Sequence, residues 1–346
     1  MIAPLPVAVL AVDVGNRKTD LALVAADGSV LATARGATAS HQAVGLARGL
    51  EQLVRLATRA ASGADGSAGD AFGERSATAA PLATVGAFCL AGADTPRDVR
   101  RLARAIGRLG LASDVLVRND TDAALRAGAP DGWGVALICG EGFNCLGVNP
   151  DGRSVRFPAL GPISGDWGGG YALGLAALGA ALRGRDGRGP RTALERAVPS
   201  YFGLRRPLDV TYAIYAGRLA ERRLGELAPV VFAVAGAGDA EARGIADHLA
   251  DELAGAAVAT IRRLRLVRAR VPVVLAGGVF GTDDAAFHAR LREGIQARAP
   301  RARVARLGVP PVAGAALLGL DRIGAPASAR ERLLGEMTEE RLAASG

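Results

Sequence analysis

An order of elements that occurs twice constrains this chain more than any other feature. Apolar runs at residues 7–12, 21–24 and 29–35 predict three consecutive antiparallel strands, and a helix–strand–helix–strand–helix order follows them. The same order begins again after Trp133. Because internal repetition determines architecture before local detail does, the sequence predicts an α/β protein made of two βββαβαβα domains that face each other across a central cleft.

The remaining predicted elements fill in both halves of the chain. Further strands are expected at residues 83–90, 115–118, 134–139, 145–148, 153–157, 271–276 and 303–305, and helices at 41–61, 96–109, 119–126, 239–267, 284–298, 312–320 and 329–344. A stretch rich in Gly, Ala, Ser and Asp at 62–80 indicates a surface loop. The 346 residues suit two domains of roughly 150 residues each. We place these domains at 1–128 and 129–346, the second with a largely helical insertion at about 169–234.

Composition excludes several classes of partner. The net charge of +8 is carried almost wholly by arginine, but these arginines are scattered over helical patterns, and few aromatic residues lie among them to stack on bases. No apolar run reaches the roughly 18 residues of a membrane span, and no export signal precedes the first strand. The cysteines Cys89, Cys139 and Cys145 lack metal-ligand spacing and indicate buried thiols. We therefore expect a cytoplasmic protein that binds neither nucleic acid nor membrane.

A polar turn joins the first two predicted strands. It carries Asp13, Gly15, Asn16 and Lys18, the chain's only lysine. Gly15 and Asn16 are residue types that tolerate positive φ in hairpin loops. A turn with free backbone N–H groups, a cation and a nearby carboxylate can hold a phosphate and its magnesium ion. A solvated hairpin tip explains the same residues, so this turn alone leaves both interpretations open.

Five stretches that occur in a fixed order carry a resemblance to a known family. They are DVGNRKTD at 13–20, NDTDAAL at 119–125, GEGFNC at 140–145, GPISGDWG at 161–168 and LAGGV at 275–279. Together they resemble the BadF/BadG/BcrA/BcrD ATPase family and, within it, the N-acetylglucosamine kinases. The resemblance runs from about residue 7 to 320. It implies two duplicated RNase H-like domains in an actin-like ATPase fold, of the wider actin/hexokinase/Hsp70 superfamily.

The resemblance also implies ATP and Mg²⁺ as cofactors, an amino sugar as substrate and a role for particular residues. Asp13 would hold magnesium through water, and Asp120 would be the general base that accepts the proton of the sugar hydroxyl. The first phosphate hairpin would comprise Gly15, Asn16, Arg17, Lys18 and Thr19, and the second Gly140, Glu141 and Gly142. Gly277 and Gly278 would lie beside adenine and ribose, and the sugar would contact Ser40, Asn144, Gly161 and Asp166.

Each of these positions also has a purely structural interpretation. Asp120 is explained equally well as a helix N-cap residue, and the sequence alone does not separate it from Asp122. Asp166, between a glycine and a tryptophan, is explained as a turn residue that bonds its own backbone. Asn144 is explained as a turn residue at a strand edge, and Gly277 as the end of a strand.

Five positions depart from the family pattern, and one of them is Ser40, which stands where sugar kinases of this type often have asparagine. Arg17 stands where a small hydroxyl residue or glycine is usual, and Glu141 and Phe143 replace the Thr and Ser of a Gly-Thr-Gly-Ser turn. Leu160 stands where tryptophan is common beside the sugar. A carboxylate at Glu141 would repel a triphosphate. The sequence therefore supports a sugar kinase and, as an alternative, a sugar- or nucleotide-binding protein of the same fold with weakened or lost turnover.

Two further expectations concern relatives and assembly. Activator ATPases of 2-hydroxyacyl-CoA dehydratases belong to the same wider family and hold an iron–sulfur cluster through cysteines. The cysteines of this chain lie on predicted buried strands and argue against that function. Apolar faces of the inserted helices, around residues 219–234, are expected to form a homodimer contact.

Overall fold

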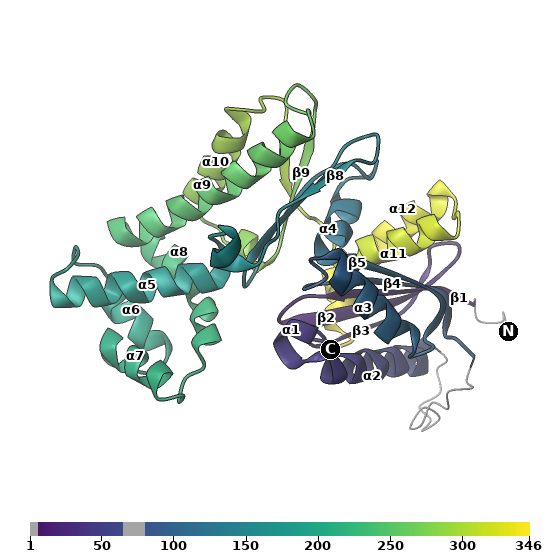
Figure 1. Ribbon diagram of the computed structural model, residues 1–346, viewed down its shortest axis with the longest axis horizontal. Helices are drawn as coiled ribbons and strands as arrows, with labels where there is room; N and C mark the ends of the chain where they lie inside the picture. The colour runs from purple at the N-terminus through teal and green to yellow at the C-terminus, as the bar shows by residue number, and fades with distance from the viewer. Residues whose placement is uncertain (1–5, 65–79) are drawn as a thin grey trace. The chain divides into compact units, whose positions relative to one another are not determined.

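The computed structural model describes residues 6–64 and 80–346, and its contacts divide the chain into two compact units (Figure 1). Unit 1 contains the chain up to Trp133 together with Leu307–Gly346, and unit 2 is Gly134–Arg306. The predicted domains differ from these units at the C-terminus, because residues 307–346 were expected in the second domain. The loop predicted at 62–80 lies mostly outside the described residues.

Unit 1 is built on a mixed sheet of the predicted topology. Its strands are β1 (Val7–Val14), β2 (Lys18–Ala25), β3 (Val30–Ala37), β4 (Ala83–Leu90) and β5 (Ala112–Asn119), in the spatial order β3-β2-β1-β4-β5. The opening strands pair antiparallel, whereas β1, β4 and β5 pair parallel. β1 and β2 are almost wholly buried, as strands covered by helices on both faces should be.

Alternate residues of the central strands enter two different cores. Leu10, Val12 and Val14 pack with α2 (Leu46–Ala64) and α3 (Pro96–Gly107) on one face of the sheet. Val9 and Ala11 pack on the other face with α4 (Asp120–Gly128), α11 (Pro311–Arg322) and α12 (Ala327–Glu336). The C-terminal segment therefore completes the core of unit 1, which explains why it does not belong to the second domain.

Unit 2 repeats the sheet of unit 1, as predicted. Its strands are β6 (Gly134–Cys139), β7 (Phe143–Val148), β8 (Ser154–Arg156), β9 (Pro272–Ala276) and β10 (Arg303–Arg306), in the order β10-β9-β6-β7-β8. With β6 matched to β1 and β9 to β4, this is the order of the first sheet. The helices are α5 (Gly169–Asp186), α6 (Leu194–Tyr201), α7 (Pro207–Tyr215), α8 (Ala228–Gly236), α9 (Ala240–Arg263) and α10 (Ala285–Gln296), with short 3₁₀ turns at Gly161–Ser164, Glu221–Leu227 and Gly278–Gly281.

Two helices predicted as continuous are interrupted. The helix expected at 41–61 is α1 (His41–Val44) followed by α2, because Gly45 between them adopts φ 84°. The helix expected at 329–344 is α12 followed by α13 (Glu339–Ala343), and the Thr338 side chain caps α13 by accepting a hydrogen bond from the Arg341 N–H. Apolar periodicity continues across both breaks and so does not reveal them.

The C-terminal helices also cover the edge of the first sheet. The Val30 N–H on β3 donates to Glu336 Oε2 (2.9 Å), and the Arg341 guanidinium donates to the Val30 carbonyl. Further along, the Arg35 N–H donates to the Ser345 carbonyl (3.4 Å). Covered strand edges resist pairing with other chains. Among the described residues, no helix has the length and apolarity that crossing a membrane requires.

Candidate functional site

In unit 1 the predicted site residues gather where strands of the parallel part of the sheet end. Strand register pairs Asp13 with Cys89, and Leu90 with Asn119. Asp120 follows directly as the first residue of α4. Carboxyl ends of parallel strands are where open α/β sheets bind ligands. The fold thus brings Asp13 and Asp120 to one edge of the sheet, although they are 107 positions apart in the sequence.

The β1–β2 hairpin is tied to the segment that leads into α1. The Gly15 N–H donates to the Lys18 carbonyl (3.0 Å), and Thr38 Oγ1 donates to the Gly15 carbonyl (2.6 Å). Ser40 Oγ lies 3.1 Å from Asn16 Oδ1, so a predicted sugar residue contacts a predicted phosphate residue. The Thr19 hydroxyl accepts from the Ala39 N–H (2.8 Å) and is buried. These bonds hold the hairpin and the predicted sugar-binding segment as one assembly.

The β1–β2 hairpin does not need Gly15 for a positive φ, which is the reason that the sequence suggested. Neither Gly15 nor Asn16 has positive φ. A Cβ added at Gly15 would meet only the Lys18 carbonyl oxygen, at 3.7 Å, which is ordinary contact. Nothing in the fold of this hairpin therefore requires glycine. Its absent side chain leaves the backbone open to close approach from outside, as a phosphate-binding turn requires.

Asp13 is a buried carboxyl among other carboxyls. Its side chain is 9 % exposed, and burial raises its pKa well above the usual range, with further contributions from Asp120 and Asp20. Lys18 acts in the opposite direction. Clustered carboxylates in a low-dielectric site repel one another and favour a cation among them. Within the described residues no group of three or more His, Cys, Asp or Glu side chains is arranged to hold a metal by itself.

The Lys18 ammonium is bound to a carboxylate on its own strand. Its Nζ lies 2.8 Å from Asp20 Oδ2. The Asp20 side chain is fully buried, and Arg35 grips it with Nε–Oδ1 and Nη2–Oδ2 distances of 2.6 and 2.9 Å. Arg35 also contacts Glu339 of α13 (2.8 Å). The sequence alone does not reveal this network, because its members lie on β2, β3 and α13.

In unit 2 the β6–β7 hairpin is fastened to the start of α5. The Gly140 carbonyl accepts from the Gly170 N–H (2.7 Å), and the Glu141 carbonyl accepts from the Tyr171 N–H (3.0 Å). A Cβ at Gly169, which has φ 83°, would come within 2.4 Å of the Glu141 oxygen. Gly140 and Gly142 themselves have open space around them. The run of glycines at 168–170 is the signal in the sequence that could have revealed this close packing.

The two glycines after β9 have different roles. Gly277 has φ 102°, and a Cβ there would lie 2.4 Å from the Cys139 carbonyl oxygen, so the fold itself requires glycine. Gly278 is exposed, and a Cβ there would have no other atom within 4 Å. The structural interpretation therefore explains Gly277 fully and leaves Gly278 without a structural reason.

Gly161 and Asp166 lie in one tight turn. The Asp166 N–H donates to the Gly161 carbonyl (3.2 Å), and the Ser164 hydroxyl contacts the Asp166 carboxylate. Gly165 between them is left-handed. Asn144 lies on β7, where its Oδ1 accepts from the neighbouring Cys145 N–H (2.8 Å). The structure thus brings Gly161 and Asp166 together, and their hydrogen bonds agree with the turn interpretation as well as with a sugar contact.

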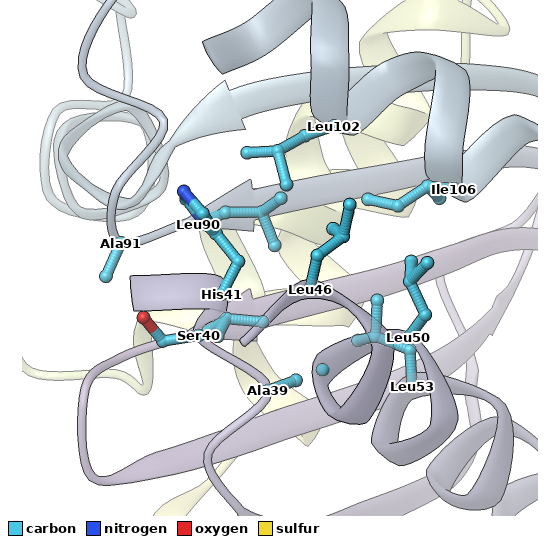
Figure 2. A pocket seen from close by; sticks show the side chains of 12 residues that line it. Ala39, Ser40, His41, Leu46, Leu50, Leu53, Leu90, Ala91, Leu102 and Ile106 are labelled. Carbon is cyan, nitrogen blue, oxygen red and sulfur yellow. The ribbon is translucent and has the colours of Figure 1, made fainter. Parts of the chain in front are cut away.

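Four of the five departures from the family pattern lie at accessible positions. Arg17 is exposed at the hairpin tip, Glu141 and Phe143 are half-buried, and Leu160 is 46 % exposed. Phe143 packs beside the glycine run 168–170: a Cβ added on Gly168 would lie 3.2 Å from Phe143 Cβ. An apolar pocket of unit 1 adjoins the first hairpin, with Ser40, His41 and Ala91 at one side and leucines of α2 and α3 at the other (Figure 2).

Comparison with solved structures defines the class of protein. A candidate N-acetylglucosamine kinase from Chromobacterium violaceum matches with a TM-score of 0.70 and 24 % identity, over 91 % of this chain and 99 % of that one. A ROK hexokinase from Thermus thermophilus matches with a TM-score of 0.53 and 20 % identity, over 91 % and 99 %. The duplicated five-stranded sheets and these neighbours define an actin-like ATPase fold.

Sequence comparison then gives the family. The model of the BadF/BadG/BcrA/BcrD ATPase family matches residues 10–319, and the chain belongs to this family. It is 33 % identical over 195 residues to an N-acetylmuramic acid/N-acetylglucosamine kinase of Clostridium acetobutylicum, over 56 % of this chain and 64 % of that protein. It is 30 % identical over 244 residues to an N-acetyl-D-glucosamine kinase of Dictyostelium discoideum, over 69 % and 76 %. The resemblance recognised in the sequence is confirmed.

Proposed function

We propose that this protein is an ATP-dependent carbohydrate kinase that phosphorylates N-acetylglucosamine or a closely related amino sugar, with Asp120 as general base. The observation that carries the proposal is the meeting of Asp13 and Asp120 at the carboxyl edge of the first sheet, beside a hairpin whose glycine the fold does not need. The curated relatives named above, both kinases of N-acetylated amino sugars, support the substrate class.

The first hairpin and Asp13 would hold the phosphates and their metal. Phosphoryl transfer needs chiefly positioning and charge neutralisation. Mg²⁺ prefers carboxylate oxygen and usually binds through one or two carboxylates together with substrate phosphates. The buried Asp13, repelled by Asp120 and Asp20, fits that donor chemistry, and the ion would supply neutralisation of the phosphate charge. Gly15, Asn16, Arg17, Lys18 and Thr19 are assigned to one phosphate hairpin, Gly140, Glu141 and Gly142 to the other, and Gly277 and Gly278 to the nucleoside.

The position of Asp120 at a helix N-terminus supports its proposed role as the base. It is the first residue of α4, whose positive dipole end stabilises a negative charge there. A base at this position would take the proton of the attacking sugar hydroxyl, a contribution of roughly 10²–10⁴-fold to the rate. Ser40, Asn144, Gly161 and Asp166 are assigned to holding the sugar. The residue Asp120 is half-buried, and its Oδ1 is shielded from solvent.

A second candidate function is a sugar- or nucleotide-binding protein without turnover. The observation that favours it is the carboxylate of Glu141 in a hairpin whose neighbours on both sides are open glycines. Arg17 at the tip of the first hairpin and Phe143 after the second also depart from the family pattern, and both departures support a protein without turnover. We further propose a cytoplasmic location, which the three free and buried cysteines support.

The proposed function is tested by ADP release with a panel of amino and neutral sugars. We expect turnover with N-acetylglucosamine or a near relative, and a loss of about 10²–10⁴-fold in kcat for Asp120→Asn. Asp122→Asn, a matched change two residues along the same helix, should keep most of the activity. Sugar binding by calorimetry without ADP release would instead support the second candidate, and an active Asp120→Asn variant would exclude Asp120 as base.

A further inference from the structure

The connection between β4 and α3 contains a carboxylate that joins two elements of the site. Asp94 Oδ1 accepts from Asn119 Nδ2 (2.9 Å), and Asp94 Oδ2 accepts from Gln42 Nε2 of α1 (3.3 Å). We propose that Asp94 is a positioning residue, which fixes the N-terminus of α4, and with it Asp120, and ties that end of the helix to α1. The inference rests on the proposed role of Asp120 as base.

Asn119 is the residue through which Asp94 acts. It ends β5 and caps α4, is 2 % exposed, and its Oδ1 accepts from both the N–H (3.1 Å) and the hydroxyl (2.6 Å) of Thr121. The cap requires the amide oxygen to face Thr121, so the amide NH₂ must face the opposite side. The Asp94 carboxylate is the acceptor on that side. An Asn119 amide turned over would set its NH₂ against the Thr121 N–H and lose the cap.

Asp94 is not needed for the start of its own helix. Thr95 and Asp98 form the capping box of α3: the Thr95 N–H donates to Asp98 Oδ2 (3.1 Å), and the Asp98 N–H donates to Thr95 Oγ1 (3.2 Å). Pro96 occupies the first turn. The α3 N-terminus is therefore capped by its own residues, whereas the Asp94 carboxylate accepts hydrogen bonds from Asn119 and Gln42 on the other two elements.

The second arm of Asp94 leads to the predicted sugar-binding segment. α1 has four residues, none of them buried, and it is bounded by Ser40 and by Gly45 with φ 84°. A Cβ on Gly92 would lie 2.7 Å from Gln42 Cδ and 2.8 Å from His41 Cε1, so α1 rests directly on the backbone before Asp94. Figure 2 shows Ser40, His41 and Ala91 on the same side of the apolar pocket. One carboxylate thus serves both the sugar segment and the base helix.

The test compares three variants of the full chain in sugar phosphorylation. Asp94→Ala removes both contacts and should lower kcat by about 100-fold, the effect of moving a catalytic group by about 1 Å, while KM for ATP stays within about twofold. Asp94→Asn keeps a carbonyl acceptor for Asn119 and should restore most of kcat. Asp98→Asn makes the same charge change four residues along, at the α3 cap, and should leave kcat unchanged even where it lowers the melting temperature.

Hydrogen exchange gives a readout that does not depend on turnover. The amides of residues 120–123 should exchange faster in Asp94→Ala than in the wild type, and at the wild-type rate in Asp94→Asn. Unchanged exchange and unchanged kcat in Asp94→Ala would overturn the inference. Equal losses of kcat in Asp94→Ala and Asp94→Asn, in proportion to a lowered melting temperature, would also overturn it. An active Asp120→Asn variant would refute the proposed base, whereas the exchange rates would still decide whether Asp94 holds the helix.

Discussion

At the scale of single residues, the glycines of the site divide into those that the fold requires and those that it does not. Gly169 has φ 83°, and a Cβ added there would lie 2.4 Å from the Glu141 carbonyl oxygen. Gly142, by contrast, is exposed, and a Cβ added there would meet open space. The first kind explains itself through packing. The second kind needs a reason outside the protein, and a phosphate that approaches the backbone supplies one.

This division predicts opposite outcomes for two alanine variants. Gly142→Ala should change the free energy of unfolding by no more than about 0.5 kcal/mol and raise KM for ATP, because its methyl group would stand where the phosphates approach. Gly169→Ala should lose more than about 1 kcal/mol of stability, because alanine is strained at positive φ. Urea unfolding and ATP titration check both. A Gly142→Ala variant with wild-type KM for ATP would argue against phosphate binding at the second hairpin.

The cysteines give a prediction about pH. Burial raises the pKa of Cys139 and of Cys145 to about 12, and that of Cys89 well above its usual range. Since the thiolate is the reactive form and appears only as pH rises toward the pKa, the folded protein should resist thiol reagents from pH 7 to pH 9. Spectrophotometric titration should detect all three thiols only after denaturation. Fast modification of the folded protein at pH 8 would contradict this burial.

At the scale of elements, the sequence predicted where the strands lie, but it did not predict which distant residues the fold brings into contact. Apolar runs identified every strand of both sheets, and their repeated order correctly gave the shared topology. Apolar periodicity did not show that Gly45 adopts φ 84° and ends a helix. The roles of the site residues were predicted from the resemblance to the family. The sequence does not indicate a role for Asp94, because its partner Asn119 becomes a neighbour only when β4 pairs with β5.

The helical insertion corrects one expectation about assembly. The apolar residues expected to be exposed around 219–234 are mostly buried inside unit 2, among them Leu224, Leu227 and Val231. A surface of large apolar side chains lies instead on the preceding helix α7, where Leu208, Tyr212 and Tyr215 are 42 %, 54 % and 91 % exposed. Their spacing of four and three residues sets them on one face of the helix.

The homodimer stays a prediction, and α7 is now the surface that we propose for it. Tyrosine is enriched at protein interfaces because it combines a large apolar ring with a polar end. Tyr215→Glu should therefore dissociate a dimer without lowering the melting temperature, since the side chain is 91 % exposed. Sedimentation velocity checks the mass. Arg222→Glu, an exposed change outside α7, is the control, and a wild-type monomer at micromolar concentration would contradict the proposed dimer.

At the scale of the whole molecule, the chain enters and leaves unit 2 once. Unit 2 is one continuous segment, Gly134–Arg306, and contains all strands of its sheet, whereas unit 1 is assembled from both ends of the chain. α11 packs on β1 and α4 so closely that a Cβ on Gly314 would lie 1.8 Å from the Ala123 carbonyl oxygen. Nothing local in the sequence of α11 specifies which of two similar sheets it covers, and for this reason the predicted boundary at residue 128 did not separate the last helices from the second domain.

This connectivity predicts that the two units differ in their ability to fold alone. In α11, Val312, Leu317 and Leu320 are at most 1 % exposed, and burying such side chains contributes about 1.5–3 kcal/mol each. Their loss is comparable to the roughly 5–15 kcal/mol that stabilises a whole domain. Fragment 134–306 should thus unfold cooperatively by circular dichroism, whereas fragment 1–133 should not. Adding the peptide 307–346 should restore a cooperative transition to 1–133 and leave 134–306 unchanged, and a fragment 1–133 that folds unaided would refute the assignment of α11 to its core.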